Sequence, residues 1–114
     1  MDPFGINKKV LDKDVLVIVW GEFGRTPRVN ASAGRDHWGQ VMSVLMSGGG
    51  LRMGQAIGTS NERGEEPKDR PIKPQDILAT MYRHLGIDTR TTFNDHTGRP
   101  ISLLSEGEVI RELV

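Results

Sequence analysis

The segment Val15–Trp20, Val-Leu-Val-Ile-Val-Trp, decides the fold of this 114-residue chain. Its unbroken apolar run, rich in β-branched residues, has the length and composition of a strand buried on both faces. We therefore expect a strand over residues 14–20, ended by Gly21. Ligands of open α/β sheets collect beyond the carboxyl ends of parallel strands. Glu22, the next residue, is predicted to lie where such folds place their chemistry.

A glycine-rich loop is predicted over residues 21–38, and it carries a second carboxylate and an imidazole, Asp36 and His37. A loop of this length is usually functional or disordered, and an extended surface loop is the alternative. Imidazole and carboxylate groups bind divalent metals, and a neighbouring acid orients a ligating histidine. Glu22, Asp36 and His37 are therefore candidate metal ligands. The plainer alternatives are a solvated His37 and a Glu22 that pairs with a nearby arginine.

The same loop holds the closest approach to a basic cluster, Arg25, Arg28 and Arg35, which could meet an anion. Across the whole chain, 15 Lys and Arg balance 15 Asp and Glu, so the formal net charge is zero. That balance argues against a general nucleic-acid binder.

The absence of cysteine excludes disulfides and thiolate metal ligands. No apolar run is long enough to span a bilayer, and the N-terminal residues lack a signal-peptide core. We expect a cytoplasmic protein without nucleic-acid or membrane partners.

Residues 1–13 are predicted to form a polar lead-in, and residues 14–114 a single α/β domain. The clearest element is an amphipathic helix over 74–85, with proline in its first turn, Asp76 near the positive end of its dipole, and Gly86 after its end. Its apolar stripe consists of Ile77, Leu78, Met81, Tyr82 and Leu85.

The remaining elements are short. We expect strands over 41–47, 55–59 and 101–104, and a strand or helical turn over 109–114. Residues 61–70 are predicted to be an exposed loop or hairpin end, and residues 88–100 to be polar and rich in turns.

Several short motifs, in order, give residues 14–114 a family resemblance. They are Gly-Glu-Phe-Gly-Arg-Thr-Pro at 21–27, Gly-Arg-Asp-His-Trp at 34–38, Ser-Gly-Gly-Gly at 47–50, Lys-Asp-Arg-Pro at 68–71, Asp-Ile-Leu-Ala-Thr at 76–80, Leu-Gly-Ile at 85–87 and Gly-Arg-Pro-Ile at 98–101. The chain resembles the C-terminal part of the family called domain of unknown function 1501, within the alkaline phosphatase and sulfatase superfamily. The resemblance implies a partial alkaline-phosphatase-like α/β sandwich, with a short, mainly β-sheet core and one amphipathic helix at about 74–85.

The resemblance also implies a metal-dependent phosphate or sulfate ester hydrolase that binds zinc or manganese. Glu22 matches the strand-end acid and His37 the later histidine, with Asp36 beside it and Arg25 or Arg35 contacting the anion. The superfamily usually shows Asp-His at the strand end, whereas this chain has Glu-Phe. Phe23 cannot bind a metal, so one ligand must come from elsewhere.

The part that bears the nucleophile is absent, so no catalytic residue is assigned and the chain is expected to be an inactive C-terminal fragment. Its expected partner is the missing N-terminal hydrolase portion or a second copy of the chain. For full-length relatives, export from the cell stays an open alternative. The alternative is a non-catalytic small α/β domain that acts through self-association or protein binding, since uncovered apolar surface favours association.

Overall fold

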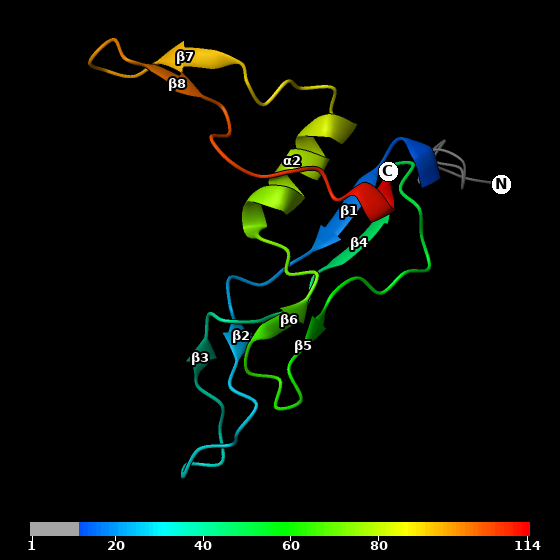
Figure 1. The fold of residues 1–114 in the computed structure, drawn as a ribbon, viewed down its shortest axis with the longest axis vertical. Helices are drawn as coiled ribbons and strands as arrows, with labels where there is room; N and C mark the ends of the chain where they lie inside the picture. The colour runs from blue at the N-terminus through cyan, green and yellow to red at the C-terminus, as the bar shows by residue number, and fades with distance from the viewer. Residues whose placement is uncertain (1–11) are drawn as a thin grey trace, which may run out of the picture.

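The computed structural model describes residues 12–114, so most of the predicted lead-in over 1–13 lies outside the described residues. Short strands and one full helix make up the fold (Figure 1). In order they are β1 (Leu16–Val19), β2 (Gly24–Arg25), β3 (His37–Trp38), β4 (Leu45–Gly48), β5 (Thr59–Ser60), β6 (Pro67–Asp69), α2 (Pro74–His84), β7 (Thr92–Asn94), β8 (Pro100–Ser102) and the 3-10 turn η1 (Arg111–Leu113).

The strands form four separate antiparallel pairs, β1 with β4, β2 with β3, β5 with β6 and β7 with β8. The fold is therefore mixed α/β, as expected. Over residues 12–114 no strand pairs in parallel, so the parallel-sheet setting predicted for Glu22 is wrong. A parallel neighbour needs a long crossover connection, whereas the chain after β1 folds into a hairpin and returns as the antiparallel partner β4.

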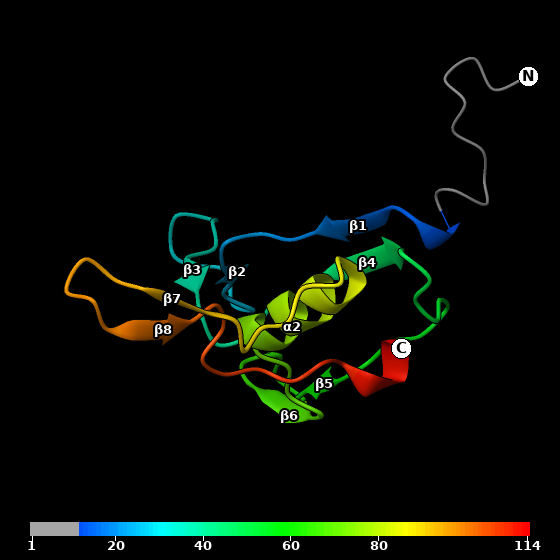
Figure 2. The same ribbon diagram turned by 90° about the horizontal axis from the view of Figure 1, so that it is seen from above.

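The predicted first strand is confirmed over Leu16–Val19, but its predicted burial on both faces is wrong. Leu16 and Ile18 are half-buried and share one face of β1, and α2 lies beside the β1–β4 ribbon (Figure 2). On the opposite face Val17 is 45% exposed and Val19 60% exposed. Burial alternates because only one face of this two-stranded ribbon is covered.

The predicted helix is confirmed as α2, Pro74–His84. The Asp76 carboxylate accepts a hydrogen bond from the backbone N–H of Lys73 at 2.9 Å, which satisfies a free donor at the start of the helix. At the other end Gly86 adopts a left-handed conformation with φ of 71°, as a residue after a helix end commonly does. Local sequence signals therefore set both ends of this element.

The core lies where the C-terminal segment crosses α2. Among the described residues the buried apolar side chains are Ile77, Ala79 and Ile110. Thr80, 1% exposed, donates its hydroxyl to the Asp76 carbonyl at 2.8 Å and accepts the N–H of Ile110 at 3.0 Å. This contact fastens two segments that are far apart in the sequence.

Asp76 makes a second link to the same segment, since its other carboxylate oxygen accepts the N–H of Glu108 at 2.9 Å. Burial raises the pKa of this carboxyl, but the N–H groups of Glu108 and Lys73, with the charges of Lys73 and Arg70, outweigh it. The pKa of Asp76 therefore lies below its ordinary value of 3.8.

Two of the other predicted strands are confirmed with shifted bounds. The 41–47 segment becomes β4, which begins at Leu45, and the 101–104 segment becomes β8, which begins at Pro100. Residues 109–114 contain a helical turn, η1. The strand over 55–59 is wrong except at its last residue, because β5 begins only at Thr59.

Four strands were not anticipated: β2 and β3 in the predicted 21–38 loop, β6 in the predicted 61–70 hairpin end and β7 in the turn-rich 88–100 segment. Proline, lysine and aspartate are poor strand formers, so β6 carries no propensity signal. Its partner strand supplies the cause, since Thr59 donates its hydroxyl to the Asp69 carboxylate at 3.0 Å. Pairing with β5 therefore stabilises β6 in the strand conformation.

The molecule is open in shape. Its Cα radius of gyration is 17.9 Å, compared with about 13 Å for a compact domain of roughly 100 residues. The β7–β8 hairpin and the β2–β3 hairpin extend in different directions from the central helix (Figure 1). A large share of apolar surface therefore stays uncovered.

Candidate functional site

The predicted 21–38 loop is a hairpin built on β2 and β3. Its register places Gly24 opposite Trp38 and Arg25 opposite His37. A side chain at Gly24 would collide with the backbone of Val41, so glycine is required at this close approach. The hairpin therefore brings two of the five predicted site residues, Arg25 and His37, directly across from each other.

Hydrogen bonds inside the hairpin order its tip. The Asn30 side-chain oxygen accepts the N–H groups of Ser32 and Gly34, and its amide donates to an Asp36 carboxylate oxygen at 3.0 Å. Thr26 and Asp36 exchange two further bonds, each 3.0 Å, from the Thr26 N–H to the Asp36 carbonyl and from the Asp36 N–H to the Thr26 hydroxyl. Asp36 thus holds the loop in shape.

The two candidate arginines differ in their surroundings. Arg35 donates through Nη1 to the carbonyls of Thr26 and Pro27, both at 2.7 Å, so it links the two sides of the hairpin at its surface. Arg25 donates one long bond of 3.3 Å to the Arg35 carbonyl, and its guanidinium carbon lies 5.6 Å from the centroid of the Phe23 ring. The Arg25 guanidinium therefore makes fewer and longer hydrogen bonds than the Arg35 guanidinium.

Phe23 is a site residue that sequence reasoning assigned no role. Its ring centroid lies 4.0 Å from that of His37, with the ring planes 34° apart. It therefore contacts both members of the cross-strand pair Arg25 and His37. The sequence offered one signal for this role. Phe23, the residue after Glu22, lies two residues before Arg25, and residues two apart on a strand share a face.

The predicted metal ligands are not gathered as one donor group. Over residues 12–114 no three His, Asp or Glu side chains come together closely enough to hold a metal ion, and Glu22, Asp36 and His37 all fall in that range. Asp36 is also committed to Asn30. Zinc or manganese binding at these residues stays a prediction that requires donors from outside the hairpin.

A tryptophan anchors the hairpin to the rest of the molecule. The indole N–H of Trp38 donates to the Glu65 carbonyl at 2.7 Å. The Glu65 N–H in turn donates to the side-chain oxygen of Asn61 at 2.8 Å, inside the β5–β6 turn. This connection supports the base of the hairpin on a second ribbon.

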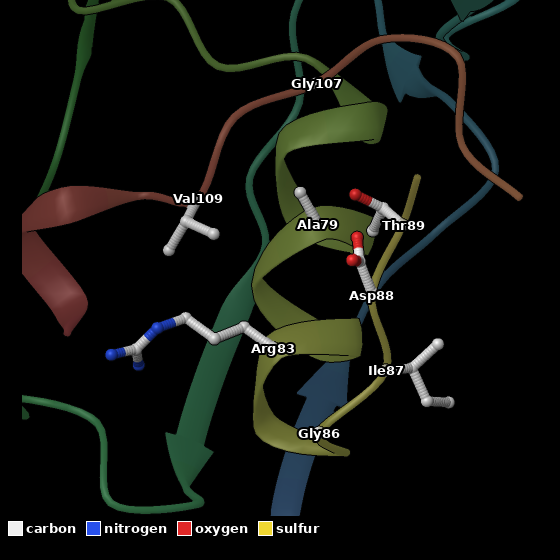
Figure 3. Close-up of a pocket in the computed structure, with 8 residues that line it drawn as sticks. All are labelled: Ala79, Arg83, Gly86, Ile87, Asp88, Thr89, Gly107 and Val109. Carbon is white, nitrogen blue, oxygen red and sulfur yellow. The ribbon is translucent and has the colours of Figure 1, made fainter. Parts of the chain in front are cut away.

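Two shallow hollows lie elsewhere on the surface. One, of about 350 Å³, lies beside the C-terminal half of α2 (Figure 3) and is lined by Ala79, Arg83, Gly86, Ile87, Asp88, Thr89, Gly107 and Val109. The other, of about 300 Å³, is lined by Arg70, Lys73, Asp76, Gly107 and Glu108. Neither is lined by any residue of the predicted site.

A family model described as "Protein of unknown function (DUF1501)" matches residues 6–114. No curated protein and no solved structure matches the chain. The family expectation is thereby confirmed, and the link to alkaline phosphatases and sulfatases stays a prediction. Within residues 12–114, no helix is long and apolar enough to cross a membrane.

Proposed function

We propose that this chain, which belongs to the DUF1501 family of proteins of unknown function, acts through self-association. In the proposed assembly, β1 of one copy pairs with β1 of a second copy. The observation that carries this proposal is the apolar outer face of the β1–β4 ribbon. Val17, Val19 and Leu45 are 45%, 60% and 58% exposed there. The register places Val19 opposite Leu45, so these side chains form one surface.

The backbone of β1 supports pairing along its free edge. Gly49 donates its N–H to the Val15 carbonyl at 2.9 Å, so the odd-numbered residues of β1 direct their hydrogen-bonding groups toward β4. The N–H and C=O groups of Leu16 and Ile18 then point to the other edge. In the described part of the chain no strand pairs with that edge.

The side chains of β1 favour a second copy as the occupant. Edge strands usually carry lysine, proline or a bulge that prevents pairing, and Val15–Trp20 contains none of these residue types. In an antiparallel pair centred on Val17, Leu16 hydrogen-bonds with Ile18 of the second copy. Val15, Val17 and Val19 of both copies then form a continuous ladder without like-charge repulsion.

Sedimentation velocity over a range of concentrations tests this proposal. The parent chain is expected to dimerise, and Val17→Lys to be monomeric, because two lysines would meet at the symmetry axis. Val29→Lys is the matched control, since Val29 is a 57% exposed valine in the hairpin tip and should leave the dimer unchanged. A monomeric parent, or a Val17→Lys chain that dimerises as well as the parent, would refute the proposal.

A second candidate function is favoured by the cross-strand pair Arg25 and His37, which lies in the hairpin between β1 and β4. We propose that the hairpin contributes to a metal-dependent phosphate or sulfate ester hydrolase site, with Glu22, Asp36 and His37 toward the metal and Arg25 or Arg35 toward the anion. Metal-assisted hydrolysis needs an activated nucleophile and a fixed coordination shell, which an N-terminal hydrolase portion would supply.

Titration calorimetry with zinc and manganese tests this second candidate. The parent chain is expected to bind weakly and to hydrolyse no ester on its own. His37→Ala should remove the binding heat, and His96→Ala, a histidine in the distant β7–β8 turn, is the matched control. Equal heats for the parent and His37→Ala would show that His37 is not a ligand.

A further inference from the structure

We propose that residues 107–114, the C-terminal arm, are an exchangeable ligand, and that their acceptor site also binds the arm of a second copy of the chain. The arm runs across α2 to η1 (Figure 1). The acceptor site comprises the residues that hydrogen-bond the arm, which are Arg52, Gln55, Arg70, Asp76 and Thr80. Two chains that exchange arms form a reciprocal dimer with both sites filled. This dimer uses no residue of β1 and no metal, so it goes beyond both functions proposed above.

The first support is the match between the arm and α2. The Glu108 N–H donates to the Asp76 carboxylate at 2.9 Å. The Ile110 N–H donates to the Thr80 hydroxyl at 3.0 Å. Alternate residues of an extended chain repeat at roughly 6.6 Å, and residues four apart on a helix at roughly 6 Å. One face of α2 therefore binds the backbone of an extended segment at two successive positions.

The second support is a set of polar contacts further along the arm. Arg70 donates to both carboxylate oxygens of Glu112, at 2.7 and 3.0 Å, a paired geometry that specifies direction as well as charge. The Gln55 amide donates to the Glu112 carbonyl at 2.7 Å. The Arg52 N–H donates to the Leu113 carbonyl at 2.8 Å. The acceptor site therefore selects a carboxylate at one position and fixes the register of the arm.

The backbone at Arg70 points in the same direction. Its φ is 51°, in the left-handed region that residues with a Cβ rarely adopt. A Cβ on Gly58 would lie 3.0 Å from the Arg70 carbonyl, so glycine allows this close approach. Such strain persists only where neighbouring structure holds it, and it is concentrated at ligand clamps and switch regions. Arg70 is thus held in an unusual conformation at the point where it binds Glu112.

The third support is the short hinge before the arm. The chain is anchored up to Leu104, whose N–H donates to a backbone carbonyl before β7 at 3.2 Å. The arm begins at Gly107, where a Cβ would lie 2.5 Å from the Gln75 carbonyl. Only Ser105 and Glu106, both exposed, lie between these two points. Short hinges favour the exchange of an element between copies.

Exchange conserves the contacts of the arm. Ile110, 2% exposed, is the only buried side chain among residues 107–114, so release of the arm uncovers little apolar surface. The other contacts are directional hydrogen bonds to the acceptor site, and an identical arm forms them again from a second chain. The exchanged dimer therefore needs no new interface, and high protein concentration favours it by mass action.

A charge-reversal pair tests the exchange, in a Val17→Lys background that removes the proposed β1 pairing. The Arg70→Glu chain has an intact arm and an acceptor site that repels it. The Glu112→Arg chain has the opposite defect. In the exchanged dimer of the two, both acceptor sites meet an arm of opposite charge. We expect each variant alone to be monomeric in sedimentation velocity. Their equimolar mixture should form a heterodimer and regain protection of the Ile110 N–H in amide hydrogen exchange.

Two controls accompany the mixture. Arg63→Glu mixed with Glu62→Arg carries the same opposite net charges on exposed residues of the β5–β6 turn, and neither residue forms an ion pair within residues 12–114. This mixture should stay monomeric, and a heterodimer as strong as that of the test pair would overturn the proposal. The double variant Arg70→Glu/Glu112→Arg restores opposite charges within one chain, so it should match its background in Ile110 protection.

The hinge offers a second test that leaves the acceptor site unchanged. Deletion of Ser105 and Glu106 leaves the anchored Leu104 too close to Gly107 for the arm to reach its own α2, so this variant should dimerise in the Val17→Lys background. A Gly-Ser-Gly insertion between Ser105 and Glu106 is the control and should be monomeric, because a longer hinge allows docking within one chain. A monomeric deletion variant, or a charge-reversal mixture without heterodimer, would overturn the proposal. Neither readout depends on β1, so the β1 pairing can fail separately.

Discussion

The hydrogen bond from the Ile110 N–H to the Thr80 hydroxyl tests the structure most directly. Thr80 is 1% exposed and Ile110 2% exposed. Thr80→Val keeps the size and shape of the side chain but leaves this buried N–H without its partner, which costs about 1–3 kcal/mol. Thr80→Ser keeps the hydroxyl and loses one methyl group, which costs about 1 kcal/mol. Valine is therefore expected to destabilise the fold more than serine.

Two measurements follow from this pair of variants. Urea unfolding gives the loss of stability, and amide hydrogen exchange gives the protection of the Ile110 N–H itself. We expect Thr80→Val to lose protection at Ile110 and Thr80→Ser to retain most of it. If valine and serine gave equal protection at Ile110, or if valine were the more stable, the docking of the C-terminal segment on α2 through this hydroxyl would be wrong.

Two further predictions concern the ribbon end and the C-terminal ion pair. Gly49→Ala should lower the free energy of unfolding by more than the roughly 1–2 kcal/mol that a left-handed conformation costs a residue with a Cβ. The reason is that the new Cβ would lie 2.9 Å from the Leu16 Cβ. Gly50→Ala, with similar φ but open space, should cost only that amount, and equal urea midpoints would contradict the packing. The hydrogen bond from Arg70 lowers the pKa of Glu112 from 4.5 to about 2. Its stabilising contribution is present above pH 4.5 and lost as the pH falls toward 2. Arg70→Gln should raise this pKa toward 4.5 in a carboxyl NMR titration, and an unchanged value would refute the pairing.

The elements that sequence predicted well are those specified by neighbouring residues. Helix α2 has proline in its first turn, Asp76 near its start and Gly86 after its end, and all of these signals act within one or two turns. The strand at Leu16–Val19 was also predictable, since its β-branched run has no competing structure. What sequence could not predict was its partner, and so the burial of its faces was overestimated.

The candidate site shows the same division. Sequence placed Arg25, Asp36 and His37 in one loop, but their roles depend on the register of β2 with β3, which sequence does not specify for such short strands. That register sets Arg25 opposite His37. The bond from Asn30 turns Asp36 toward the loop's own tip. Phe23 stands out only once the two strands are paired.

The order of the first strands has a consequence for how the chain assembles. The β2–β3 hairpin is nested inside the connection between β1 and β4, so its closure brings the ends of the longer connection together. Each halving of an effective loop lowers the entropic cost of closing it by about 0.6 kcal/mol. The inner hairpin is thus expected to form first and to speed docking of the outer ribbon. A proline at Asp36, which removes the N–H that the Thr26 hydroxyl accepts, should slow that later step in stopped-flow refolding.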